Sequence, residues 1–404
     1  MVRKFIALLG SQIFVSLGGL SIPPLIPFFQ PKLGLTYTQV GSIMTFLYIG
    51  AMIMSLPAGW LTDTLGIKKM IFLSQVIMGV FVILFSAIGN YLMAILLAFL
   101  MGLGYGMVNP PTTKGIMLLV KKGNRGFLMS LKQTGVPIGG AIAAGLLPPL
   151  AILFSWRFSF ILAGILVILG GFLSYILYHQ DREKSFSFNS NPEETSKSDW
   201  RKIFKNKDII FLSVASAFCS MVQIALVTYL ILYLRDVKKF DLILASSFLA
   251  LVNIGGILGR IFWGAVSDRL FKGSRKIVLK LLVSLIFLIS LILGLNIDLP
   301  LVILFFVIFI FGLSAIGWNG VYHAFIVELS GKELAGKAIG ISLAIVFIGN
   351  LSGPIIFGKI IDISGSYNMA WYFLSATMVG AFFLLNRIRE EKISVGSIRS
   401  SRWA

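Results

Sequence analysis

Long apolar stretches separated by short polar segments run along almost the whole chain. Each stretch has about 20 residues or more, which is enough for one helix to cross a hydrocarbon layer of about 30 Å. The sequence contains twelve such stretches, and we expect helices at 5–29, 37–61, 70–89, 91–119, 127–153, 157–179, 209–235, 242–266, 277–295, 300–328, 336–361 and 369–389. The pattern therefore predicts an all-α membrane protein.

One long polar segment divides these stretches into two groups of six. Residues 180–208 are rich in Ser, Asn, Lys and Glu and contain no apolar stretch. A segment of this composition cannot bury enough apolar surface to form a packed core. We therefore expect an N-terminal six-helix bundle at 1–179, a cytoplasmic linker at 180–208, a C-terminal six-helix bundle at 209–389 and a cytoplasmic tail at 390–404.

The composition supports a membrane protein. Of the 404 residues, 57% are hydrophobic and only 13% are charged, and the mean hydropathy is +0.93. Soluble domains carry about 25% charged residues. The net charge of +19 would suggest a nucleic-acid partner in a soluble protein. In this chain the position of the basic residues is more informative than their total.

The distribution of Lys and Arg predicts the orientation. If both termini lie on the same side as the linker, 26 of the 35 Lys and Arg residues belong to segments on that side. The positive-inside rule places such segments in the cytoplasm. We therefore expect a multi-pass protein of a bacterial-type plasma (inner) membrane with cytoplasmic termini, contacts to membrane lipids and no nucleic-acid partner.

A short motif occurs once in each half of the chain, directly after the second and the eighth predicted helix. In both copies an aspartate follows a glycine, and the two copies are 205 residues apart. A duplicated six-helix unit is typical of transporters whose binding site lies between the halves. The motif residues are Gly59, Asp63 and Lys68 in the first copy, and Gly264, Asp268 and Arg269 in the second.

This motif resembles the signature loop of the major facilitator superfamily (MFS), and the resemblance covers essentially the whole chain. It implies the MFS fold, with 12 transmembrane helices in two pseudo-symmetric six-helix bundles that rock about a central site. It also implies that the motif residues form a conformational latch, in which Asp63 and Asp268 cap a neighbouring helix and hold the outward-facing state. We expect a monomer with no cofactor and no metal site.

Three basic residues lie inside predicted helices, whereas none of the 16 acidic residues lies near a helix midpoint. The three are Lys114, Lys132 and Arg260. Basic residues in a membrane interior are costly and usually face a water-filled pathway, so we expect an anionic substrate to neutralise them. The alternative for the lysines is that their long side chains reach the headgroups. The alternative for Arg260 is a pair with the loop that contains Asp268.

Arg260 resembles the carboxylate-binding arginine in the eighth helix of the monocarboxylate and oxalate transporter families. A guanidinium can hold a carboxylate through two parallel hydrogen bonds. The MFS resemblance also implies that the first, fourth, seventh and tenth helices line the cavity, where a hydrogen bond to a neighbouring helix is the alternative role for each amide. The further substrate-binding candidates on these helices are Asn109, Gln223, Asn319 and Tyr322.

Proton coupling has two candidates. His323 is one of only two histidines and lies well inside a predicted helix. An imidazole can take up a proton near neutral pH, although a neutral packing histidine is an equally good interpretation. Glu328 follows on the same helix, at its inner end. A proton could therefore pass between them, or move with the substrate.

These features favour a secondary active transporter that moves a small organic anion, such as a carboxylate, by rocker-switch alternating access. The first alternative is an efflux transporter for amphipathic or cationic compounds, which an acid inside the membrane would have supported. The second is a membrane-embedded solute sensor or enzyme. An enzyme would need a nucleophile with its base or a metal cluster, and two separated histidines with one cysteine offer neither.

Overall fold

The chain folds almost entirely into helices. Twelve helical segments of the computed structural model are long and apolar enough to cross a membrane, and the described residues include no strand. This confirms the predicted all-α membrane fold. The structure describes residues 2–119, 125–179, 203, 205–271 and 273–389. Most of the expected linker at 180–208 and the whole tail at 390–404 lie outside those ranges.

Three of the first six spans are broken, and each of these three consists of two helices. The helices are α1 (Val2–Gly19), α2 (Ile22–Leu33), α3 (Tyr37–Leu65), α4 (Ile67–Phe85), α5 (Tyr91–Met107), α6 (Asn109–Leu119), α7 (Arg125–Gln133), α8 (Gly135–Leu153) and α9 (Trp156–Leu177).

The last six spans follow the polar linker. Their helices are α11 (Lys207–Asp236), α12 (Leu242–Arg269), α13 (Arg275–Gly294), α14 (Leu301–Ala315), α15 (Trp318–Ser364) and α16 (Tyr367–Arg387). The tenth span consists of α14 and the first part of α15, and the eleventh span is the rest of α15, so a kink and not a polar loop separates these two spans. The two spans bend at Gly331, where the backbone has φ 72° and ψ 164°. Glycine tolerates positive φ because it has no Cβ.

Prolines accompany the breaks in the first half. The fourth span, which we expected as one helix at 91–119, breaks between α5 and α6, directly before Pro110 and Pro111. The fifth span breaks at Thr134, between α7 and α8, and Pro137 follows in the first turn of α8. A proline has no N–H and therefore removes one hydrogen bond of the helix. Such breaks are tolerated at membrane depth only where other groups satisfy the backbone.

Glycines bring matching helix pairs of the two halves into direct backbone contact. In the first half, a Cβ at Gly50 or Gly102 would collide with a backbone carbonyl across the contact between α3 and α5. In the second half, the same is true of Gly259 and Gly312 at the contact between α12 and α14. Small residues at such positions let helix backbones approach closely in lipid. The corresponding contacts support the duplication that the sequence motif indicates.

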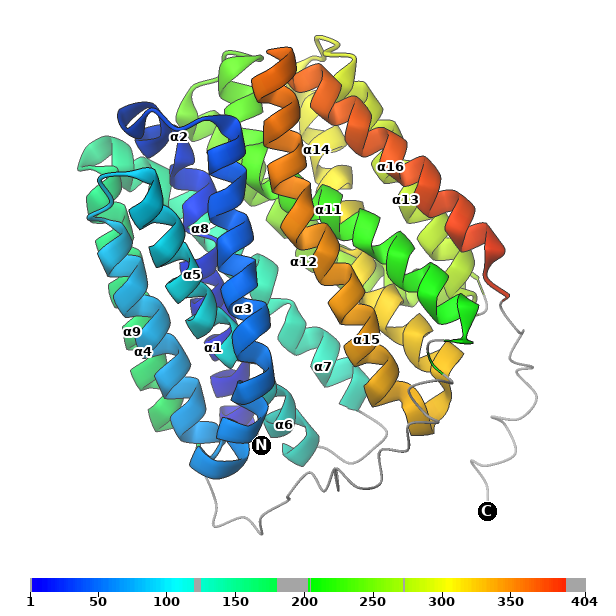
Figure 1. Cartoon of the computed structure of the whole chain (residues 1–404). Coiled ribbons are helices and arrows are strands. Elements are labelled where there is room, and N and C mark those ends of the chain that lie inside the picture. Colours follow the sequence, from blue (N-terminus) through cyan, green and yellow to red (C-terminus); the bar gives the residue numbers. More distant parts are fainter. Residues whose placement is uncertain (1, 120–124, 180–202, 204, 272, 390–404) are drawn as a thin grey trace, which may run out of the picture.

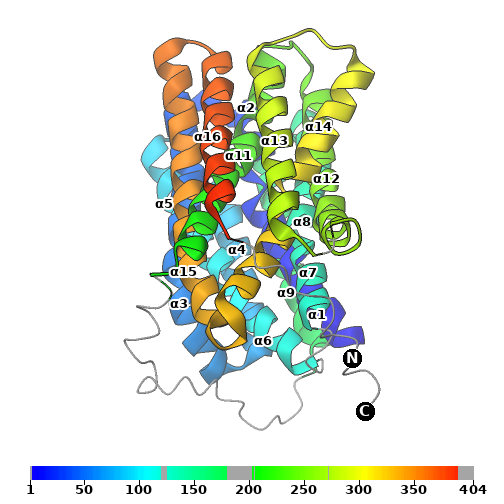
Figure 2. The ribbon, with the colours of Figure 1, turned by 90° about the vertical axis from the view of Figure 1, so that its right-hand side faces the viewer.

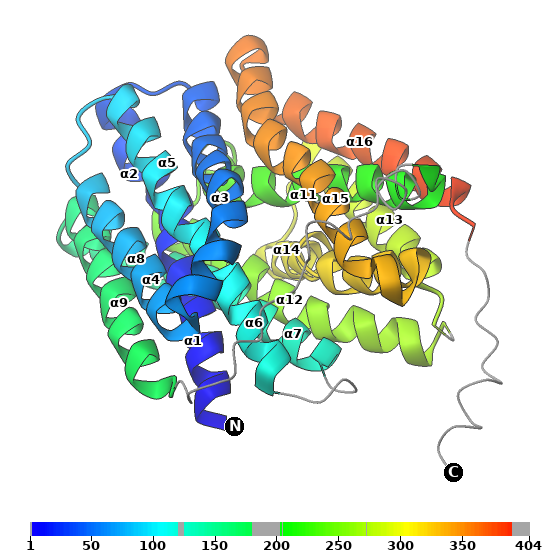
Figure 3. The same cartoon turned by 60° about the horizontal axis from the view of Figure 1, so that its bottom comes forward.

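The two groups of helices lie side by side, with α1 to α9 on the left and α11 to α16 on the right of Figure 1. The groups touch where α3 packs against α15, α8 against α12 and α2 against α11. Figure 2 shows the second group in front, and Figure 3 brings forward the end of the molecule where α1 begins. We call that end the terminal end. We call the opposite end, which holds Tyr37, Asp236 and Asp362, the contact end.

Candidate substrate site and gates

Two cations lie buried between the halves. Lys132 on α7 has no exposed surface, and Arg260 on α12 is 8% exposed. Within the described ranges, these are the only charged side chains that are buried. Lys132 and Arg260 interact electrostatically with each other, and both act on His323 of α15. Three of the predicted site residues, from three different spans, are thus brought together.

Lys132 has only neutral partners. Its Nζ lies 3.3 Å from Oδ1 of Asn109, 3.2 Å from Oγ1 of Thr112 and 3.5 Å from Oγ1 of Thr113. All three partners belong to α6, directly after the break in the fourth span. Lys132 therefore does not reach the headgroups, and this alternative is excluded. Asn109 and Lys132, two of the substrate-binding candidates, thus lie beside each other.

Arg260 crosses from the second half to the first. One terminal nitrogen of its guanidinium donates a hydrogen bond to the backbone carbonyl of Gln133. Its Nε is buried and has no hydrogen-bond partner among the described residues. Arg260 does not pair with Asp268 among the described contacts, because its partner is the Gln133 carbonyl, whereas Asp268 pairs with Arg275 at 2.6 Å. Arg260 thus has an unused donor in the interior.

The amides on α11 and α15 bond to each other. Oε1 of Gln223 accepts hydrogen bonds from Trp318 Nε1 at 3.0 Å and from Asn319 Nδ2 at 3.2 Å. Both amides are half-buried. The interhelical hydrogen bond that the sequence left open as an alternative is therefore present for Gln223 and Asn319.

Tyr322 and His323 are neighbours with different surroundings. The Tyr322 hydroxyl is buried and lies 2.5 Å from Oγ of Ser342, which in turn lies 2.6 Å from Oγ of Ser213. This chain of hydroxyls joins the tenth, eleventh and seventh spans, so Tyr322 contributes to packing. His323 is half-buried, and its ring lies 4.9 Å from the Tyr322 ring, centroid to centroid.

Two polar side chains of α1, Gln12 and Ser16, are buried. Gln12 and Ser16 have no exposed surface. No described residue bonds to the side-chain oxygen or nitrogen of Gln12, whereas the Ser16 hydroxyl lies beside that of Tyr105. Both Gln12 and Ser16 contact the glycines that open α8, Gly135 and Gly139. Buried polar groups are normally hydrogen-bonded. Gln12 and Ser16 could therefore bond to polar groups of a ligand. They are four residues apart and so share one helix face, which can be recognised in the sequence.

Lys114 occupies a different place from Lys132. Its Nζ lies 2.6 Å from Oδ1 of Asp63, at the terminal end of α3. The expectation that Lys114 has no acidic partner is therefore wrong. Sequence analysis could not indicate this pair, because the helices that carry Lys114 and Asp63 are separated by an entire span.

The second motif copy has a similar ion pair. Arg275 lies 2.6 Å from Asp268 and donates to Glu328 at 3.1 Å. Asp63 and Asp268 thus both bind within their own half in this conformation. A Cβ at Gly59 or Gly264 would meet no atom within 4 Å.

Lys68 of the first motif copy is also engaged within its own half. Its Nζ lies 4.0 Å from the centroid of the Tyr175 ring on α9. A lysine over an aromatic face is an attractive contact. The motif residues whose contacts are described here therefore hold helices of a single half together.

The contact end is closed by a carboxylate of the second half that caps a helix of the first. Asp362 accepts hydrogen bonds from the backbone N–H groups of Tyr37 at 2.9 Å and Thr38 at 2.7 Å, and from the Thr38 hydroxyl at 2.5 Å. Both residues open α3. The first N–H groups of a helix have no partner within the helix, and a negative charge there is favourable.

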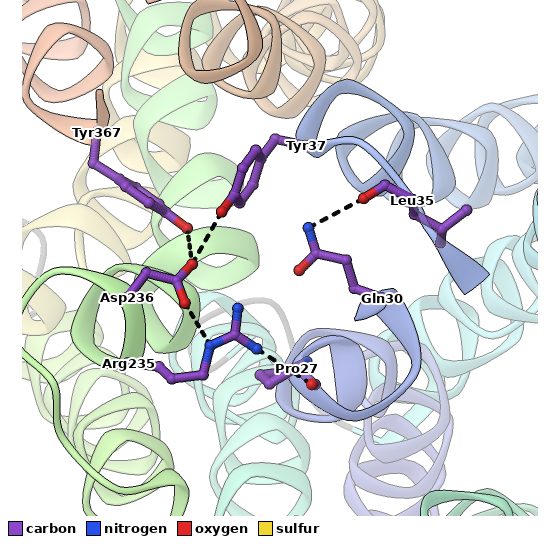
Figure 4. Close-up of polar contacts among 7 residues, drawn as sticks. All are labelled: Pro27, Gln30, Leu35, Tyr37, Arg235, Asp236 and Tyr367. Atoms are coloured by element: carbon purple, nitrogen blue, oxygen red, sulfur yellow. Dashed lines mark hydrogen bonds and ion pairs between the residues drawn. The ribbon is translucent and has the colours of Figure 1, made fainter. Parts of the chain in front are cut away.

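A second carboxylate at the contact end, that of Asp236, connects three spans through hydrogen bonds (Figure 4). Asp236 accepts hydrogen bonds from the hydroxyls of Tyr37 at 3.1 Å and Tyr367 at 2.6 Å, and pairs with Arg235 at 2.5 Å. Arg235 also donates to the carbonyl of Pro27 at 3.2 Å. The sequence analysis missed these contacts between the halves, because hydrophobic periodicity does not indicate which distant helix ends meet.

We expect Asp362→Ala to weaken the contact end. Loss of an N-terminal capping carboxylate costs about 1 kcal/mol, which changes a ratio of two conformations by about fivefold. Spin labels at Lys32 and Leu295, on opposite halves, should show a larger population of long distances. Asp298→Ala is the matched control, because Asp298 pairs with Lys238 of its own half and is 98% exposed. Equal distance distributions for the two variants would contradict the assignment.

Comparisons with known proteins agree with this architecture. Residues 8–354 match the family model of the Major Facilitator Superfamily. The probable sulfoacetate transporter SauU of Cupriavidus necator is 24% identical, over 92% of this chain and 89% of that protein. The hexuronate transporter of Bacillus subtilis is 25% identical, over 98% of this chain and 95% of that protein. The quinolone resistance protein NorA of Staphylococcus aureus is 26% identical, over 90% and 91% of the two chains.

The fold is also similar to a solved structure. A bacterial homologue of the human lysosomal transporter Spinster, in an inward-facing and occupied conformation, superposes with a TM-score of 0.71 at 17% identity, over 95% of this chain and 96% of that one. The family match covers most of the chain, and the twelve spans and the paired signature loops agree with it. The chain therefore belongs to the major facilitator superfamily of membrane transporters.

Proposed function

We propose that this transporter moves a small organic anion by secondary active transport. The observation that carries the proposal is the pair of buried cations, Lys132 and Arg260, whose described partners are all neutral. Taking a charge out of water costs several kcal/mol after relaxation. A bound anion would supply the missing counter-charge, and the unpartnered Nε of Arg260 would supply a donor for it.

The chemistry of the site suits an anion whose acidic group carries two or more oxygens, such as a carboxylate or sulfonate. A guanidinium presents parallel N–H groups that match two oxygens of one acidic group. A lysine ammonium acts as a compact point charge, so Lys132 could bind a second acidic group of the same molecule. Asn109, Gln12 and Ser16 could bond to hydroxyl groups. The resemblance to transporters named for sulfoacetate and hexuronate supports this class of substrate.

We propose further that both termini are cytoplasmic, as the distribution of basic residues indicates. The contact end would then face outward, and the contacts between the halves at Asp362 and Asp236 would be those of an inward-facing state. In the outward-facing state, the latch residues Asp63 and Asp268 would exchange their partners within one half for partners across the halves. The open space beside Gly59 and Gly264 leaves room for that approach.

Efflux of amphipathic or cationic compounds is the second candidate, and the similarity to NorA favours it. A cationic compound would need an acidic partner in the interior. In the described part of the chain, the acidic residues of the spans lie near the two membrane ends, where Asp63 and Glu328 are at the terminal end and Asp236 and Asp362 at the contact end. The buried charges are positive, so an anion fits this interior better.

We expect Arg260→Ala to abolish binding and uptake of the anion. Arg260→Lys should restore little, because a lysine cannot form the two parallel bonds. Lys132→Met should weaken binding of a dianion more than that of a monoanion, whereas Lys114→Met should leave binding nearly unchanged. The assay is a thermal-shift and proteoliposome-uptake panel of sulfonates, mono- and dicarboxylates, sugars and lipophilic cations. Preferential binding of cations, or normal uptake by Arg260→Ala, would reject the proposal.

We expect Asp63→Asn to slow turnover more than it weakens binding. The substitution removes the negative charge that Lys114 pairs with and that the latch would use, and both lie away from the buried cations. Uptake kinetics should therefore show a reduced maximal rate at a nearly constant half-saturation concentration. A large loss of affinity at an unchanged rate would mean that Asp63 belongs to the substrate site.

We expect uptake to rise as the external pH falls, because a proton bound by His323 would move together with the anion. The charges of Lys132 and Arg260 act on His323, and a bound anion would offset them, so anion and proton would bind together. Glu328 would pass the proton to the terminal end. His323→Gln should flatten the pH response but retain exchange of anion for anion. Identical pH profiles of mutant and wild type would remove His323 from the mechanism.

A further inference from the structure

The carbonyl group that holds Arg260 is available because of a proline. In an α-helix, the carbonyl of one residue accepts from the N–H four residues later. For Gln133 that residue is Pro137, which has no N–H. The helix resumes directly afterwards, since the N–H of Ile138 bonds to the Thr134 carbonyl at 3.1 Å. The Gln133 carbonyl is therefore left without a helical donor at the break between α7 and α8.

Arg260 takes the place of that donor. Its Nη1 bonds to the Gln133 carbonyl, while its Nε is buried and unpartnered. A guanidinium fixed through Nη1 keeps its opposite edge, formed by Nε and Nη2, for another acceptor. That edge carries two parallel N–H groups, which is the arrangement that binds a carboxylate bidentately. The carbonyl thus selects the edge of Arg260 that remains free.

The same arrangement occurs independently at the contact end. The carbonyl of Pro27 would accept from residue 31, which is also a proline. Arg235 of α11 donates its Nη1 to this carbonyl at 3.2 Å, and its Nε is turned to Asp236 (Figure 4). In both cases an arginine of the second half bonds to a carbonyl of the first half that a proline has left free. In the second case the remaining nitrogen, Nε, does hold a carboxylate.

We propose that Pro137 is a positioning residue for the substrate: by leaving the Gln133 carbonyl free, it orients Arg260 so that its Nε edge receives the anion. This inference rests on the proposed function. The contact at Arg235 illustrates the expected result, since Asp236 occupies there the position that the substrate's acidic group would occupy at Arg260.

The test compares two replacements of Pro137 that differ in one N–H group. Alanine supplies an N–H that can bond to the Gln133 carbonyl, whereas lactic acid, introduced as an α-hydroxy acid by nonsense suppression, has the same side chain and no N–H. Hydrogen bonds to charged groups contribute enough to change an equilibrium by about tenfold or more. We expect Pro137→Ala to weaken sulfoacetate binding about tenfold and the lactic acid variant to bind as the wild type does.

Pro149→Ala is the matched control in the same helix. Its substitution frees an N–H for the carbonyl of Gly145, an exposed glycine with no atom near its Cβ position. This variant should bind sulfoacetate normally. Equal affinities of the alanine and lactic acid variants at position 137 would overturn the proposal.

A second measurement needs no ligand and therefore separates this inference from the proposed function. In the wild-type background, Pro137→Ala should lower the melting temperature, because the buried guanidinium loses its acceptor. In an Arg260→Met background the same substitution should not lower it, since only a helical hydrogen bond is gained. Failure of wild type to bind any anion would reject the proposed function alone, and an equal shift in both backgrounds would reject the role of Pro137.

Discussion

Lipid offers no hydrogen-bond partner to a polypeptide backbone, and this constraint explains most of the structure. Every N–H and carbonyl within the hydrocarbon layer must be paired inside the protein, so the apolar stretches become helices. The same constraint makes each interruption informative. Where Pro137 and Pro31 remove an N–H, the carbonyls of Gln133 and Pro27 are satisfied by arginines from the other half. A local defect in one helix thereby becomes a contact between bundles.

Buried charge is the second constraint, and it separates the two lysines that the sequence presents alike. Lys114 and Lys132 lie at similar depths in neighbouring predicted helices. Lys114 has a carboxylate partner, Asp63, at the terminal end, and its side chain is 25% exposed. Lys132 is enclosed and is solvated only by an amide and two hydroxyls. A lysine that is paired with a carboxylate, as Lys114 is, suits a structural or latching role. A lysine with neutral partners only, such as Lys132, can bind an anion that enters and leaves.

Much of the fold could be predicted from the sequence, because span length, charge bias and duplication are local or statistical properties. The twelve spans and the interior position of Arg260 follow from such properties. Contacts between distant segments could not be predicted in this way. The cap that Asp362 places on Tyr37 joins residues that are 325 positions apart, and the turn of Tyr322 toward Ser342 depends on how two helices rotate against each other.

The empty surroundings of Gly59 and Gly264 have a consequence for how variants of this protein are screened. In the present conformation a methyl group at either position meets nothing, so an alanine there would leave folding, yield and detergent stability untouched. If the latch loops approach the other half at another stage of the cycle, the same methyl group would obstruct that stage. Selection for thermostable variants would then accumulate proteins that fold well and are arrested in one conformation.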